Sequence, residues 1–63
     1  MKFKLEFKMD NDSFVPYAAD EISMILKKVE NRIKWGEWDM EETGEYPISD
    51  GNGNKVGTLE ITE

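Results

Sequence analysis

The segment from Lys2 to Met9 constrains the fold more than any other, because charged and apolar residues alternate along it without interruption. Its even positions are all charged, and its odd positions carry the large apolar side chains of Phe3, Leu5, Phe7 and Met9. Successive side chains of a β-strand point to opposite faces of the sheet. The segment therefore predicts a strand with one buried and one hydrated face, as in an antiparallel sheet covered on one side only.

The apolar residues that follow recur at steps of three and four, which is typical of a helix packed on a core. Turn-forming residues 10–13 precede this segment, and Pro16 suits a first helical turn because that position needs no backbone N–H. We expect a helix from about Pro16 to Trp35, stopped by Gly36. Its core stripe consists of Ala18, Ile22, Ile25, Leu26, Val29 and Ile33.

Residues 46–61 predict a β-hairpin, with a turn at residues 50–54 in the sequence Asp-Gly-Asn-Gly-Asn. Pro47 has no N–H to donate to a ladder of hydrogen bonds, so the first hairpin strand is expected at a sheet edge. The inward apolar positions slip out of phase beside Gly57, which predicts a bulge there. The last strand then lies in the middle of the sheet.

These elements predict one α+β domain over residues 1–63, a two-layer βαββ fold. Its three-stranded antiparallel sheet has the order 1-3-2, and one helix packs on one face. A chain of 63 residues buries only about 60% of the surface that its unfolded form exposes. Without cysteine, no disulfide or thiolate metal site can stabilise it. The core must suffice alone or a second subunit must help, which leaves a homodimer open.

The residue types that most catalysis requires are missing. The chain has no histidine, the commonest general base, and its serines have no base to activate them. Paired carboxylates act as acid and base only where a cleft removes water from one of them, and a domain of this size has little room for a cleft. We expect a non-enzymatic protein with no cofactor. No long apolar run or signal-peptide pattern is present, so we expect a cytoplasmic protein without membrane contact.

The net charge of −6 is confined to the second half of the chain. Residues 1–34 hold seven basic and six acidic side chains, whereas residues 35–63 hold eight acidic ones and only Lys55. Lacking a basic stripe, the chain is not expected to bind nucleic acid directly. We interpret the acidic residues as a face for a protein partner with a basic surface, or alternatively as a solvated face. The candidate residues are Glu37, Asp39, Glu41, Glu42, Glu45 and Asp50.

A second candidate surface is apolar. Tyr17, Met24 and Trp35 fall on the helix side opposite the core stripe, and with Trp38 they form a candidate strip for a partner or a dimer. Alternatively, Tyr17 and Trp35 fold back onto loops at the helix ends and leave only Met24 exposed. Trp38 and Met40 are interpreted as plugs for the open end of the core, which turns the acidic residues around them to water.

Asp50, Asn52 and Asn54 alternate like the first ligands of a calcium-binding loop. The sixth position is Lys55, where such a loop has glycine, and the twelfth is Ile61, where it has glutamate. We therefore interpret this segment as a structural turn, and we predict no metal site.

Three segments stand out by their sequences: residues 9–14 (Met-Asp-Asn-Asp-Ser-Phe), residues 21–26 (Glu-Ile-Ser-Met-Ile-Leu) and especially residues 48–57 (Ile-Ser-Asp-Gly-Asn-Gly-Asn-Lys-Val-Gly). These segments resemble small uncharacterised proteins encoded in phage and prophage genomes. The resemblance implies a βαββ domain in a mobile genetic element and brings no catalytic residues. Small acidic phage proteins often inhibit host machinery, among them anti-restriction and anti-CRISPR proteins that imitate DNA.

Two functions follow as hypotheses. In the first, the protein is an inhibitor whose acidic face imitates phosphates and docks on a basic groove of host machinery. In the second, it is a structural or assembly module that forms a homodimer or attaches to a larger complex. The edge strand with Pro47 or the apolar strip would then make the contact.

Overall fold

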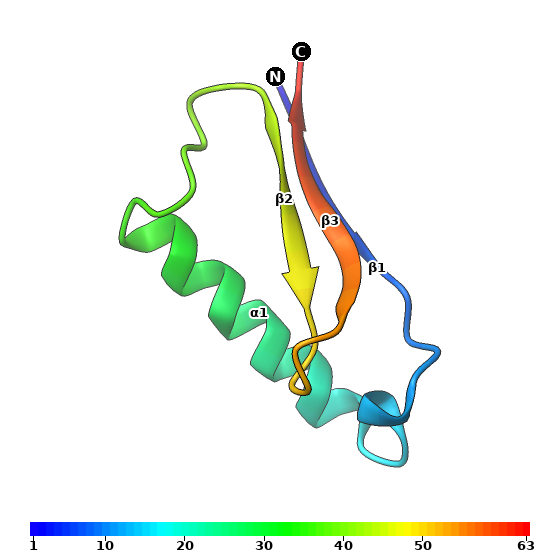
Figure 1. The fold of residues 1–63 in the computed structure, drawn as a ribbon. Coiled ribbons are helices and arrows are strands. Elements are labelled where there is room, and N and C mark those ends of the chain that lie inside the picture. The colour runs from blue at the N-terminus through cyan, green and yellow to red at the C-terminus, as the bar shows by residue number, and fades with distance from the viewer.

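The computed structural model describes residues 1–63, and its main elements follow in the order strand, helix, strand, strand. They are β1 (Lys2–Phe7), the 3-10 helix η1 (Asp12–Phe14), α1 (Ala18–Lys34), β2 (Gly44–Ser49) and β3 (Lys55–Thr62). Figure 1 shows the three strands as one layer and α1 as a second layer. The predicted α+β fold of βαββ type is confirmed, with η1 as an addition to it.

The three strands are antiparallel and lie in the order β1-β3-β2, as predicted. Pro47 lies on β2, which is an edge strand, so the sheet tolerates its missing N–H. Ile48 pairs with Gly57 but Ser49 pairs with Lys55, which leaves Val56 as the extra residue of a bulge. The predicted bulge is therefore found directly beside Gly57.

Gly57 meets a second requirement, which the sequence pattern did not reveal. It lies opposite Phe7 of β1, and a Cβ atom at this position would lie 2.5 Å from Phe7 Cα. The same atom would overlap the carbonyl oxygen of Glu6. Only glycine allows β1 and β3 to approach this closely, so Gly57 positions the edge strand β1.

The core lies between α1 and the inner face of the sheet. Ile25 and Val29 are one helical turn apart on α1, and Leu59 and Ile61 alternate on β3, so each pair points in one direction. The buried apolar side chains are Phe14, Ile25, Val29, Trp38, Ile48, Leu59 and Ile61.

Three details differ from the sequence predictions. β1 ends at Phe7, and Met9 lies beyond the strand and is exposed. α1 begins at Ala18, with Pro16 in the preceding turn, because the chain first forms η1 and buries Phe14. Leu26 was expected in the core stripe but is 47% exposed. α1 packs mainly against η1 and β2, and the side of the helix that carries Leu26 stays in contact with water.

Candidate functional site

The acidic loop, residues 37–42, begins where α1 ends. Gly36 has a φ of +75°, a conformation that other residues rarely adopt, and it ends the helix as predicted. The backbone N–H groups of Glu37 and Trp38 both donate to the carbonyl oxygen of Arg32, at 2.9 and 3.1 Å. These bonds hold the first residues of the loop against the last turn of α1.

Trp38 anchors the loop in the core and is only 8% exposed. Its ring stacks on that of Tyr46 from β2, with 5.0 Å between ring centroids and 23° between ring planes. The Arg32 guanidinium carbon lies 5.3 Å from the centroid of the Trp38 ring. The Tyr46 hydroxyl donates to the carbonyl oxygen of Asp39 at 3.1 Å. The loop is therefore pinned on both sides of its buried tryptophan.

The four carboxylates of the acidic loop, those of Glu37, Asp39, Glu41 and Glu42, are exposed. Glu37 forms a salt bridge with Arg32. The backbone N–H of Glu41 donates to Asp39 Oδ1 at 2.8 Å, which orients that carboxylate. Three of the four carboxylates have no cationic partner, so the loop presents net negative charge to solvent from a pinned backbone.

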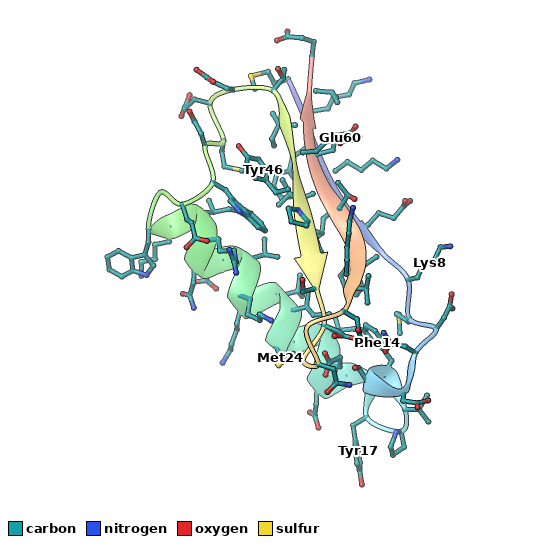
Figure 2. The ribbon with its side chains drawn as sticks, in the orientation of Figure 1. Lys8, Phe14, Tyr17, Met24, Tyr46 and Glu60 are labelled. Atoms are coloured by element: carbon teal, nitrogen blue, oxygen red, sulfur yellow. The ribbon has the colours of Figure 1, made fainter.

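Glu45 was expected on the acidic face but belongs to another surface. It lies on β2 opposite Glu60 of β3, and Glu60 lies opposite Lys4 of β1. These three residues help to line an open hollow of about 450 Å³ on the outer face of the sheet. Lys8 lines the same hollow, and Figure 2 shows Lys8 and Glu60 on the side of the sheet away from α1.

Asp50 was also expected on the acidic face, and this prediction is wrong because its side chain is 0% exposed. Its Oδ1 accepts the backbone N–H groups of Asn52 and Asn54, each at 2.9 Å. Its Oδ2 accepts the Asn11 side-chain amide at 2.7 Å and the Ser13 hydroxyl at 2.9 Å. Burial raises the pKa of the Asp50 carboxyl, but these hydrogen bonds outweigh burial and lower the pKa from 3.8 to about 2.

Further bonds extend this network at the hairpin end of the domain, where η1, the start of α1 and the turn at residues 50–54 meet. The Asn52 side-chain amide donates to the Ser13 hydroxyl at 2.9 Å, and the Gly51 N–H donates to Glu21 Oε2 at 2.6 Å. The carboxylate oxygens of Asp50 face N–H and O–H donors, which repel a cation. The calcium-like spacing thus builds a structural turn.

The apolar strip is not a continuous surface. Tyr17 and Trp35 are 70% and 77% exposed, but they flank opposite ends of α1, about 27 Å apart at 1.5 Å per residue. Met24 is partly buried against the core and the hairpin turn, near which Figure 2 shows it, whereas Tyr17 points away. Trp38 is a core residue, which agrees with its interpretation as a plug for the open end of the core. The alternative in which only Met24 is exposed is also wrong, because Tyr17 and Trp35 do not fold back.

An apolar surface that sequence reasoning missed lies at the other end of the core. Phe3 is 56% exposed although it is in phase with the better buried Leu5 and Phe7. At this open end, a hollow of about 220 Å³ is lined by Met1, Lys2, Phe3, Ile33, Met40 and Ile61. The alternating pattern marks Phe3 as inward, but it does not tell how far a helix covers the strand.

Comparison of the chain with models of protein families, with curated proteins and with solved structures finds no match. The helix of the domain lacks the length and apolar character needed to cross a membrane.

Proposed function

We propose that this protein is a non-enzymatic interaction domain whose acidic loop docks on a basic surface of another protein. The observation that carries the proposal is the group of exposed carboxylates on a backbone pinned by the buried Trp38. A segment that is ordered before binding loses less conformational entropy in the complex. Its negative charge speeds the encounter with a basic partner and disfavours acidic ones.

Trp35 supplies an apolar contact beside the acidic loop. It is the most exposed of the large apolar side chains and directly follows α1. The Lys34 ammonium nitrogen lies 5.7 Å from the centroid of its ring. Tryptophan is enriched among the residues that dominate the binding energy of protein interfaces. From the sequence, either Trp35 or Trp38 could make this apolar contact. Because Trp38 is buried, the proposal assigns the contact to Trp35 alone.

The proposal of a non-enzymatic protein draws support from the state of the buried carboxyl group. A carboxyl that acts as a general acid near neutral pH needs a raised pKa, whereas hydrogen bonds lower the pKa of Asp50 to about 2. Both oxygens of Asp50 accept donors from the chain itself. Asp50 therefore stabilises the turn and does not exchange a proton with a substrate.

The resemblance to small phage and prophage proteins supplies a biological setting for the proposal. In that setting the protein acts in the host cytoplasm as an inhibitor of machinery that handles nucleic acid, such as restriction or CRISPR complexes. Such machinery holds phosphates in basic grooves, and the acidic loop imitates the phosphate charges. The partner is then a protein, without direct contact to nucleic acid or membrane.

The test is retention of bacterial lysate proteins on the immobilised domain. We expect a partner to be retained at about 50 mM salt and released at about 500 mM, because salt screens exposed charges. Reversal of both Glu41 and Glu42 to lysine should abolish retention. The matched control reverses Asp10 and Glu30, which are exposed outside the loop, and changes the net charge equally. Equal retention by the two double variants, or no retained protein, would contradict the proposal.

A further inference from the structure

The outer edge of β1 carries backbone groups that have no partner in the sheet. β1 pairs with β3 on one side, and the strand order leaves its other side free. Successive residues of an antiparallel strand direct their N–H and C=O groups alternately to its two sides. The Lys8 N–H donates to the Val56 carbonyl at 2.9 Å, so the even-numbered residues of β1 face β3. The N–H and C=O groups of Phe3, Leu5 and Phe7 are therefore free at the outer edge.

The two edges of the sheet differ in their protection against pairing with another strand. Natural sheets blunt an edge with proline, a bulge, an inward-pointing charge or exposed charged side chains, lysine above all. β1 carries Lys2 and Lys4 on its hydrated face, but Glu6 on the same face can lie opposite a lysine of another strand. The edge strand β2 contains Pro47, whereas the ladder of β1 is regular and the strand has no proline. Phe3, on the apolar face of β1, is also more than half exposed. Both the backbone edge and the apolar face of β1 therefore suit pairing with a further strand.

We infer that β1 pairs in antiparallel orientation with β1 of a second copy of this chain, with the two-fold axis at Leu5. The charges on the hydrated face select this register. An axis at Leu5 sets Lys4 opposite Glu6 of the partner subunit, and Glu6 opposite the partner's Lys4. An axis at Lys4 would set Lys2 opposite the partner's Glu6 but two lysines opposite each other at its centre, and an axis at Glu6 would set two glutamates opposite each other. Opposite charges that face each other across strands stabilise a sheet, and like charges destabilise it.

The same register satisfies the free backbone groups. Leu5 exchanges two hydrogen bonds with Leu5 of the partner subunit, and Phe3 exchanges two with the partner's Phe7. The intervening pairs of Lys4 and Glu6 then occupy the positions where facing side chains lie closest. Lys2 and the partner's Lys8 face each other only at the ends of the pair, where Lys8 has left the strand.

The paired strands join the two sheets into one continuous sheet with both helices on the same face. Phe3 then lies beside the partner's Phe7 on the apolar face. Phe3 is more than half exposed in the single chain, and Met1, which directly precedes β1, is exposed as well. Apolar side chains that one copy leaves in water are covered by the other. The acidic loop takes no part in this contact, so the inference is independent of the proposed function.

Sedimentation equilibrium with charge reversals tests the inference. The native protein should sediment with twice the monomer mass of 7.3 kDa. Glu6→Lys and Lys4→Glu should each weaken the homodimer about tenfold, because each sets like charges opposite each other twice. An equimolar mixture of these two variants should recover native affinity, since the basic strand of one faces the acidic strand of the other.

Two measurements guard against loss of folding in the variants. Circular dichroism should show native secondary structure for Glu6→Lys, because Glu6 faces the uncharged Thr58 within its own sheet. Lys4→Glu sets a carboxylate opposite Glu60 in its own sheet, so its dimer affinity is compared only under conditions in which circular dichroism shows it folded. In the native protein, hydrogen exchange at the Phe3, Leu5 and Phe7 amides should slow as the protein concentration rises. A protein that stays monomeric at about millimolar concentration would overturn the inference. So would a dimer that neither reversal weakens, or one in which these three amides exchange at the monomer rate.

Discussion

At the hairpin end of the domain, one buried carboxylate gathers hydrogen-bond donors from η1 and from the turn between β2 and β3. At the open end, two aromatic rings stack and large apolar side chains remain in water. A buried charge is tolerated only when its oxygens are paired, so the hairpin end admits one arrangement of the chain. Apolar packing is less directional and stays incomplete at the open end. The hairpin end therefore stabilises the fold, whereas the open end, the acidic loop and the free edge of β1 carry the candidate interfaces.

The largest loss of stability is expected when Trp38, the anchor of the acidic loop, is removed. Trp38→Ala removes a side chain that stacks on Tyr46 and lies under Arg32, and it should lower the free energy of unfolding by about 3–5 kcal/mol. Urea unfolding followed by circular dichroism measures this loss. A loss below about 1 kcal/mol would show that Trp38 does not anchor the loop.

A smaller and pH-dependent effect is expected at the hairpin end. Because folding lowers the pKa of Asp50, the unfolded chain binds more protons between pH 3.8 and about 2. The stability that this carboxylate contributes is present above pH 3.8 and is lost as the pH falls toward 2. Asp50→Asn places an N–H₂ donor among donors, so the variant should be less stable at neutral pH.

The pH slope distinguishes this role of Asp50 from a general loss of packing. Unfolding free energies measured from pH 2 to 5 should fall less steeply with acid in Asp50→Asn than in the native protein. Glu42→Gln removes an exposed carboxylate and serves as the control at neutral pH, where it should keep the native free energy of unfolding. Identical slopes for Asp50→Asn and the native protein would show that the ionised Asp50 carboxylate does not stabilise the hairpin end.

The smallest effect on stability is expected for Trp35→Ala. The Trp35 side chain is mostly in water, so the free energy of unfolding should change by no more than about 0.5 kcal/mol. Retention of the lysate partner should nevertheless weaken, because Trp35 is the proposed apolar contact. Native stability together with native retention would show that Trp35 does not contact the partner.

Local sequence patterns predicted most of the architecture. Alternation in residues 2–9, the helical stripe, Gly36 and the turn at residues 50–54 predicted the elements, and Pro47 with the hairpin predicted the strand order 1-3-2. These signals report which side of an element is apolar and where the chain must turn. Both properties depend on neighbours in the sequence, so the sequence by itself determined them.

Tertiary structure decided which residues of the candidate surfaces meet water. Trp35 and Trp38 are three residues apart, yet Gly36 turns one outward and one onto Tyr46. Asp50 is one acid among many in the second half of the chain, and it is buried because Asn11, 39 residues away, donates to it. Burial depends on how segments distant in sequence pack together, and periodicity describes only the faces that each segment can offer.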